Sequence, residues 1–167
     1  MKHLETNKIL TNLNHGFRSG YSCESQLLTI NDFLKEHDKG HQVDVAILDF
    51  SKAFDTVPHN KLLHKLGQYG IKGSIHTWLR NFLTTRKMRT IVKGETSEET
   101  TVDSGVPQGT VLGPLMFLGH INDLPDSVTS SVRLFADVCL LYRTIKQEYD
   151  HQALQKDLKN LEEWANK

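Results

Sequence analysis

The sequence predicts an α+β fold in which helices cover one face of an antiparallel sheet. Three observations favour this class. After a first helix, apolar periodicity changes along the chain in the order strand, two helices, hairpin, helix, hairpin and helix. Two pairs of strand-like runs are joined by short turn segments, which is typical of antiparallel hairpins. The length of 167 residues, without repeats or an obvious linker, suits one domain with a real core.

Composition excludes several functional classes and leaves others open. Lysine plus arginine balances aspartate plus glutamate at 20 each, so net charge alone gives no argument for nucleic-acid binding. Cys23 and Cys139 have neither metal-ligand spacing nor a disulfide framework, which fits a reducing compartment. No apolar run approaches membrane-spanning length and no signal peptide precedes the first residues. We therefore expect an intracellular protein, nuclear or cytoplasmic, without a membrane partner.

The first helix is expected to begin after the N-cap Ser22, to run to about residue 37 and to stop at Gly40. Its broad apolar face consists of Leu27, Leu28, Ile30, Phe33 and Leu34. Residues 43–48 then form a nearly continuous aliphatic and β-branched run, which predicts a buried central strand. This strand ends at Asp49, and an aspartate in that place is a candidate site residue.

Two more helices follow Pro58. The first covers about residues 60–69 and ends at Gly70, and Ser74 is the expected N-cap of the second. The second helix carries apolar residues at helical spacing, at Ile75, Trp78, Leu79, Phe82 and Leu83.

The next elements are a hairpin, a loop and a helix. Residues 88–93 and 100–103 are expected to pair around a turn at residues 94–97. A loop rich in glycine and proline occupies residues 105–109. Thr110 or Ser104 then introduces a helix that includes Leu115, Met116, Phe117 and Ile121 and is closed by Pro125.

The last hairpin pairs residues 132–135 with residues 138–142 and carries Asp137 at its tip, and a final helix runs from about residue 147. An antiparallel sheet of this order can bring Asp49 and Asp137 together at adjacent strand ends. Paired carboxylates of this kind hold two divalent cations about 3.5–4 Å apart for in-line phosphoryl transfer. A zinc hydrolase is the alternative that nine histidines raise, but the sequence has no HExxH or paired CxxC pattern.

Four ordered segments resemble the reverse transcriptases of LINE-type, jockey-like non-LTR retrotransposons. Residues 46–59, AILDFSKAFDTVPH, look like polymerase motif A, and residues 104–115, SGVPQGTVLGPL, look like motif B, completed by the INDLP segment at 121–125. Residues 135–138, FADV, resemble motif C, and residues 15–24 are similar to a fingers segment of the same enzymes. The resemblance covers essentially the whole chain.

This resemblance implies a polymerase palm, a ferredoxin- or RRM-like sheet with helices on one face, over residues 41–167 and part of the fingers over residues 1–40. It implies an RNA-directed DNA polymerase that transfers deoxynucleotides to a primer 3′-hydroxyl, with an RNA template, a DNA primer and deoxynucleoside triphosphates as partners. Asp49 and Asp137 would be the catalytic metal ligands, with the backbone carbonyl of Phe50 as a further ligand. Two Mg²⁺ ions are the implied cofactor, with Mn²⁺ as the alternative.

The resemblance also assigns roles around these two acids. Phe54 would lie under the sugar of the incoming nucleotide and reject a ribose 2′-hydroxyl, although an ordinary core phenylalanine is the alternative. Gln108 would lie beside the nucleotide and template base, where Gly105 and Gly109 allow the backbone to approach.

Basic residues are candidates for nucleic-acid contacts. Arg18 resembles the fingers arginine near the phosphates, since guanidinium binds phosphate bidentately. Among the acidic residues, Asp55 matches a second acid of motif A, but a role as a helix cap or in a structural ion pair is an equally good interpretation. A basic cluster either follows the template backbone or forms a solvated edge, and consists of Arg86, Lys87 and Arg89.

Two departures from the family pattern point to a decayed copy. Val138 replaces the second aspartate of motif C, which removes a negative charge that helps hold Mg²⁺, so we expect weakened or absent activity. Gly119 and His120 replace larger apolar and aromatic residues, and the glycine is expected to loosen its helix. We also expect a fragment, because the family's first fingers motif would precede Met1 and the thumb would follow Lys167. The alternative function is a non-catalytic module, derived from a reverse transcriptase, that binds nucleic acid or protein.

Overall fold

The chain folds into two units, neither of which is continuous in sequence. The computed structural model describes residues 2–166, and the side chains at positions 2, 30, 32 and 33 lie outside that description. Unit 1 comprises Met1–Ile9 and Lys52–His120, and unit 2 comprises Leu10–Ser51 and Ile121–Lys167. Within residues 2–166, no helix has both the length and the apolar content needed to cross a bilayer.

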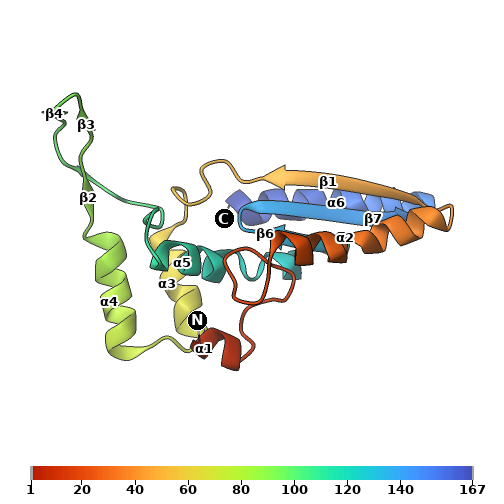
Figure 1. Ribbon diagram of the computed structural model, residues 1–167, viewed down its shortest axis with the longest axis horizontal. Coiled ribbons are helices and arrows are strands. Elements are labelled where there is room, and N and C mark those ends of the chain that lie inside the picture. The colour runs from red at the N-terminus through yellow and green to blue at the C-terminus, as the bar shows by residue number, and fades with distance from the viewer. Residues whose placement is uncertain (1, 167) are drawn as a thin grey trace. The chain divides into compact units, whose positions relative to one another are not determined.

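Unit 2 is built on a three-stranded antiparallel sheet in the order β1-β7-β6 (Figure 1). The strands are β1 (Gln42–Asp49), β6 (Ser131–Phe135) and β7 (Val138–Ile145). The register pairs Asp49 with Val138 and Phe135 with Val138, so the ends of all three strands meet at one place. The prediction of a mixed fold with an antiparallel sheet is therefore confirmed.

β1 is an edge strand, so the prediction of a buried central strand is wrong. Its only described sheet neighbour is β7, and its side chains alternate between a well-covered face and a more exposed face. On the well-covered face, Leu48 lies opposite the fully buried Cys139. On the more exposed face, Val45 is 44% exposed and Ile47 is 72% exposed. The run of aliphatic residues had suggested burial on both faces, but half of that run meets solvent.

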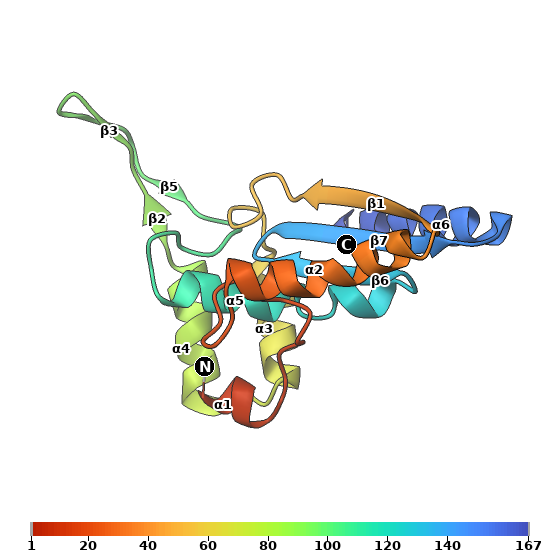
Figure 2. The same cartoon turned by 45° about the vertical axis from the view of Figure 1, so that its right-hand side comes forward.

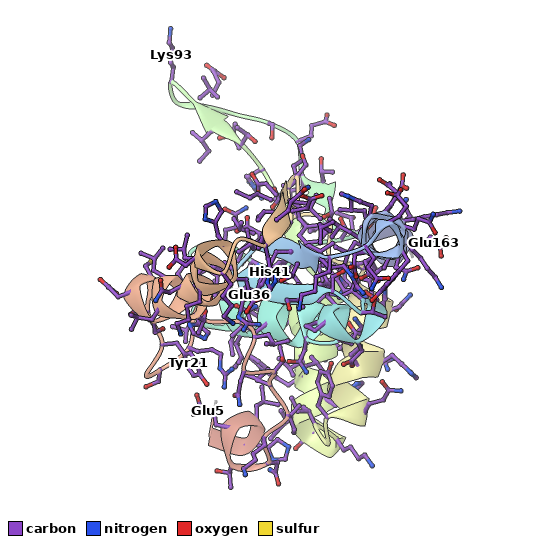
Figure 3. All side chains as sticks on the ribbon, turned by 90° about the vertical axis from the view of Figure 1, so that its right-hand side faces the viewer. Glu5, Tyr21, Glu36, His41, Lys93 and Glu163 are labelled. Atoms are coloured by element: carbon purple, nitrogen blue, oxygen red, sulfur yellow. The ribbon has the colours of Figure 1, made fainter. Side chains whose placement is uncertain are left out.

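The two long helices of unit 2, α2 (Cys23–Asp38) and α6 (Glu148–Asn166), lie on opposite faces of the sheet (Figure 3). The expectation that helices would share one face is therefore wrong for this pair. Ser22 caps α2 as predicted, because its hydroxyl accepts from Ser25 N–H in a capping box. The predicted apolar face of α2 is largely solvent-exposed at Leu27, Leu28 and Leu34, and the predicted side chains of Ile30 and Phe33 lie outside the described residues.

Buried Asp157 ties α6 to the segment that precedes β6. Its carboxylate accepts hydrogen bonds from the N–H and hydroxyl of Thr129, both at 3.0 Å, and from Ser130 N–H at 2.7 Å. Burial acts to raise the pKa of the Asp157 carboxyl, but the hydrogen bonds from Ser130 and Thr129 outweigh it and hold the pKa below its usual value. Near the other end of α6, the Trp164 indole N–H donates to Asp123 at 3.1 Å.

Unit 1 contains α1 (Lys2–Thr6), α3 (His59–Gln68), α4 (Gly73–Thr84) and α5, which spans Leu112–Ile121 and ends in unit 2. The predicted helices are present, but the prediction that Ser74 caps α4 is wrong. Lys72 is the N-cap and makes no side-chain cap bond. α5 is continuous through Gly119, and the predicted loosening of the helix stays a prediction. A Cβ at Gly119 would lie 3.2 Å from Leu66 Cδ2, so the glycine lets α5 approach α3 closely.

A hairpin follows α4 as predicted, but its turn lies at Lys93 and Gly94 rather than over residues 94–97, and its ladder is interrupted. β2 (Lys87–Met88) pairs with β5 (Thr100–Thr101), and β3 (Ile91–Val92) pairs with β4 (Glu95–Thr96). Figure 2 shows this arm extending beyond the end of α4, and Figure 3 places Lys93 at its tip.

Candidate active site

The turn between β6 and β7 holds Asp137 in a strained hairpin tip. Phe135 pairs with Val138, so Ala136 and Asp137 are the two central residues of the turn. Ala136 has a φ of 55°, in the left-handed region that tight hairpin turns require and that glycine normally occupies. A non-glycine residue there costs about 1–3 kcal/mol, which surrounding structure must offset. Asp137 is thus presented by a rigid support.

The end of β1 brings Asp49 beside this turn. Asp49 is the register partner of Val138, and the next residue, Phe50, donates its N–H to the Asp137 carbonyl at 3.2 Å. The backbone therefore places two predicted acids on adjacent strand ends in unit 2. Within residues 2–166, no group of three or more histidine, cysteine, aspartate or glutamate side chains is arranged to hold a metal ion. Val138, where the resemblance predicts a further acid, is 37% exposed.

A short loop segment before α2 supports the turn from the β6 side. Asn14 forms a parallel bridge with Leu134. The Leu134 carbonyl accepts a hydrogen bond from His15 N–H at 3.1 Å, and Leu134 N–H donates to the Leu13 carbonyl at 2.8 Å. Gly16 then passes directly against the turn, because a Cβ at Gly16 would lie 2.3 Å from Ala136 N. We call residues 13–16 the bracing segment. No side chain fits at Gly16 while the segment and the turn keep these positions.

Arg18 is held by the residues around this bracing segment. Its guanidinium donates to the carbonyl of Thr11 at 2.5 Å and lies 4.4 Å from the centroid of the Tyr21 ring. Tyr21 also makes an edge contact with buried His15, at 4.5 Å between ring centroids. Burial, with the positive charges of Arg133 and Arg18, lowers the pKa of His15 below its usual value. The predicted role of Arg18 near phosphates stays a prediction, and its described contacts are structural.

In unit 1, the 104–109 loop is fastened to the backbone around Asp55. Gly105 lies so close that a Cβ would be 2.7 Å from the Asp55 carbonyl oxygen, and its φ of 84° also favours glycine. The Ser104 hydroxyl donates to the same carbonyl at 2.7 Å. The side chain of Gln108 donates to Asp55 Oδ1 at 3.1 Å. Asp55 therefore binds the side chain of Gln108. The alternative that Asp55 caps the following helix is wrong, because Pro58 is the N-cap of α3.

Phe54 and Gln108 are joined through this loop. Val106 N–H donates to the Phe54 carbonyl at 2.7 Å, and the Phe54 ring stacks on Phe117 of α5 at 4.6 Å between centroids and 17° between planes. Asp55 and Gln108 line a cavity of about 510 Å³ together with the start of the hairpin arm. Its other walls include Arg86, Met88, Thr101 and Pro107. The cavity lies in unit 1 and the acid pair in unit 2.

The basic cluster at the base of the hairpin arm is largely engaged by other protein groups. Arg86 donates to the Gly105 carbonyl at 2.9 Å, and burial lowers the pKa of its guanidinium. Lys87 and Arg89 both pair with Glu99 on the opposing strand segment. Their predicted contact with a template backbone stays a prediction.

Sequence reasoning missed two close approaches of glycine. Gly16 lies in a segment without helix or strand periodicity, so nothing in the pattern indicated that it meets the hairpin tip. A Cβ at Gly113 would lie 2.1 Å from the Pro107 carbonyl oxygen, which packs the start of α5 against the 104–109 loop. The signal available for Gly113 was its place at the start of an apolar helix, where glycine is unfavourable unless packing requires it.

Comparison with known proteins gives one consistent result. Residues 1–167 match the family model for reverse transcriptase (RNA-dependent DNA polymerase). The chain is 30% identical over 159 residues to a probable RNA-directed DNA polymerase from transposon X-element of Drosophila melanogaster, covering 91% of this chain and 17% of the relative. It is 28% identical over 173 residues to the RNA-directed DNA polymerase from mobile element jockey of Drosophila funebris, covering 98% and 19%.

A third relative has a shorter match. The chain is 33% identical over 79 residues to a retrovirus-related Pol polyprotein from type-1 retrotransposable element R2 of Popillia japonica, covering 47% of this chain and 13% of the relative. The chain thus spans less than a fifth of the length of these three relatives.

Proposed function

Because the chain belongs to the reverse transcriptase family, we propose that it forms part of the RNA-directed DNA polymerase of a non-LTR retrotransposon. In this proposal residues 41–167 are the palm, of ferredoxin-like topology, and residues 1–40 are part of the fingers. The reaction is attack of a primer 3′-hydroxyl on the α-phosphate of a deoxynucleoside triphosphate. An RNA template selects the nucleotide, and pyrophosphate leaves.

The observation that carries this proposal is the meeting of Asp49 and Asp137 at the ends of paired strands. Two residues far apart in sequence become neighbours through the β1–β7 register and the bond from Phe50 N–H to the Asp137 carbonyl. Both acids are on one unit, on rigid strands and a braced turn, which suits groups that must keep their positions during a reaction.

The residues at this place fit a divalent cation. Reverse transcriptases use divalent metal ions, and Mg²⁺ is typically bound by one or two carboxylates together with substrate phosphates. Asp49, Asp137 and the Phe50 carbonyl would hold two Mg²⁺ ions, or Mn²⁺ in their place. Bound ions of this kind supply stabilisation of negative charge on the attacking and leaving oxygens. The two aspartates would supply the carboxylate oxygens of such a site.

The residues of unit 1 support a nucleotide-binding role. Phe54 is held by stacking on Phe117, so its ring presents a fixed surface suited to excluding a ribose 2′-hydroxyl. Gln108 is oriented by Asp55, and Gly109, with a φ of 70°, keeps the backbone beside it free of side-chain bulk. These contacts pre-organise the groups that would touch the incoming nucleotide.

Primer extension tests this function. The chain is incubated with an RNA template, a DNA primer, deoxynucleoside triphosphates and Mg²⁺, and extension is compared with that of Asp49→Asn. The amide keeps the size of the side chain and removes its charge, so we expect extension to fall to the background of a mock purification. Equal extension by the parent chain and Asp49→Asn, at any level, would reject catalysis by this chain.

Val138 favours a second candidate, a non-catalytic module that binds nucleic acid or protein. An apolar side chain lies directly across the ladder from Asp49, where a second acid would strengthen cation binding. If catalysis is absent, Val138→Asp distinguishes the causes. Recovered extension would identify Val138 as the lesion, and no recovery with intact template binding would favour the binding module.

A further inference from the structure

Charge is strongly segregated along this chain despite its zero net charge. Residues 56–94 contain eight lysines and arginines and no aspartate or glutamate. All of these residues belong to unit 1, in α3, α4, the turn between them and the first half of the hairpin arm up to its tip. The net charge of the whole molecule therefore conceals a positively charged helical pair, and a local potential rather than the total charge governs contact with a polyanion.

A groove of about 670 Å³ lies on this acid-free helical pair. It is lined by Asn60, Leu63, His64, Gly67, Gln68, Lys72, His76 and Arg80. We call it the α3–α4 groove. None of its lining residues is acidic, and every polar side chain among them carries at least one N–H donor. Such a lining is suited to oxygen acceptors that bear negative charge.

The spacing on each helix explains how the donors gather. Asn60, His64 and Gln68 are four residues apart on α3, and His76 and Arg80 are four apart on α4, so each set lies on one helix face. The His76 ring bonds through Nε2 to the Leu63 carbonyl at 2.9 Å, and since a carbonyl only accepts, Nε2 is the donor. This bond joins the two walls of the groove and fixes the ring between them.

The cationic groups of the groove are available for a ligand. Lys72 and Arg80 are exposed, and within residues 2–166 neither pairs with a carboxylate. The hairpin arm differs in this respect, because Lys87 and Arg89 already share Glu99. The groove is therefore the better phosphate-binding surface of the two, although the sequence analysis had considered only the basic cluster of the arm for this role.

We propose that the α3–α4 groove binds the phosphate backbone of single-stranded RNA. Lys72 and Arg80 would neutralise successive phosphates, and the amide and imidazole groups would donate to phosphate or ribose oxygens. A flexible strand can enter a groove between two helices, whereas a flat bilayer surface cannot. The choice of RNA rests on the proposed function, since a template is the single strand that a reverse transcriptase must hold.

The test is fluorescence anisotropy with a labelled oligouridine of about 20 nucleotides, which has no secondary structure, titrated at several salt concentrations. The groove variant is Lys72→Ala/Arg80→Ala. The matched control is Lys156→Ala/Lys159→Ala, which removes the same charge from exposed positions of α6 in unit 2. All four side chains are exposed, so we expect thermal unfolding to stay unchanged in both variants.

We expect the groove variant to bind at least about tenfold more weakly, with a salt slope smaller by about 1.4 because two phosphate contacts are lost. The control should bind like the parent chain. Equal weakening in both variants, no binding by the parent chain at about 50 mM salt, or effective competition by phosphatidylserine vesicles would overturn the proposal.

The same titration separates this proposal from the catalytic one. Asp49→Asn lies in unit 2 and should bind oligouridine as the parent chain does. Loss of primer extension with normal binding concerns the polymerase proposal alone, whereas unchanged binding by the groove variant rejects the groove alone.

Discussion

Gly16→Ala tests whether the bracing segment supports the aspartate-bearing turn. The substitution adds one methyl group at a place where a Cβ would lie 2.3 Å from Ala136 N and 2.9 Å from Ala136 Cα. Both neighbours are backbone atoms of a tight turn, so neither can rotate away as a side chain would. Either residues 13–16 separate from β6, or the turn that carries Asp137 moves.

The cost follows from the bonds that such a separation breaks. His15 N–H to the Leu134 carbonyl and Leu134 N–H to the Leu13 carbonyl would both be lost. Each is worth about 0.5–1.5 kcal/mol, and leaving buried Leu134 groups without partners adds to that cost. We therefore expect the free energy of unfolding to fall by about 2–4 kcal/mol. The largest share comes from the unsatisfied backbone groups.

Gly20→Ala is the matched control in the same loop. Gly20 has a φ of 79° but no atom within 4 Å of an added Cβ, so its substitution strains the backbone without a collision, at about 1–2 kcal/mol. Denaturant unfolding compares the two variants, and amide hydrogen exchange at Leu134 distinguishes their causes. We expect faster exchange at Leu134 only in Gly16→Ala. Unchanged exchange there would refute the bracing role, whatever the change in stability.

Three further predictions concern charge and hydrogen bonding. Val138→Asp places a carboxylate opposite Asp49, so it should destabilise the metal-free chain by about 0.2–1 kcal/mol. At a Mg²⁺ concentration about ten times Kd, bound Mg²⁺ should raise the free energy of unfolding of the Val138→Asp variant by about 1.4 kcal/mol, which corresponds to a rise in Tm of about 3–6 °C. An equal rise in Tm of the parent chain with Mg²⁺ would contradict this prediction. The lowered pKa of Asp157 means that its ionised form stabilises the fold above the usual carboxyl pKa, and this stabilisation is lost as pH falls through the lowered value. The stability difference between the parent chain and Asp157→Asn should therefore narrow below about pH 4, and a constant difference from pH 6 to 3 would count against it. Asp55→Ala removes the acceptor for the Gln108 side chain and should raise the KM for deoxynucleotides in primer extension. Asp55→Asn keeps an oxygen acceptor and should leave this KM unchanged. Similar KM values for both variants would disprove the orienting role of Asp55.

Local signals in the sequence predicted most elements of the fold, because caps and turns act over a few residues. Ser22 caps α2, and Gly70, with a φ of 83°, follows the end of α3. The predictions that failed were those of which apolar residues are buried. Ile47 and Leu28 belong to strongly apolar runs and yet are exposed. Burial depends on which element packs against a face, and local sequence does not record a partner that is distant along the chain.

The candidate site also has parts that the sequence predicted and parts that it did not. Motif order predicted that Asp49 and Asp137 would be neighbours, and the strand register brings their backbones together. The groups that hold the site were not predictable, because they act through backbone proximity. Gly16 against Ala136 and Gly105 against Asp55 are contacts between residues from distant segments, and no periodicity records them.

The pairing of β1 with β7 also has a consequence for how the chain folds. Asp49 and Val138 are partners about 90 residues apart, so forming this ladder closes a very long loop. Contacts of such high sequence separation slow folding, since chain entropy is lost before the contact stabilises anything. During synthesis β1 leaves the ribosome well before its partner exists. Its aliphatic residues must remain unpaired until the hairpin emerges, and the two acids meet only in that late step.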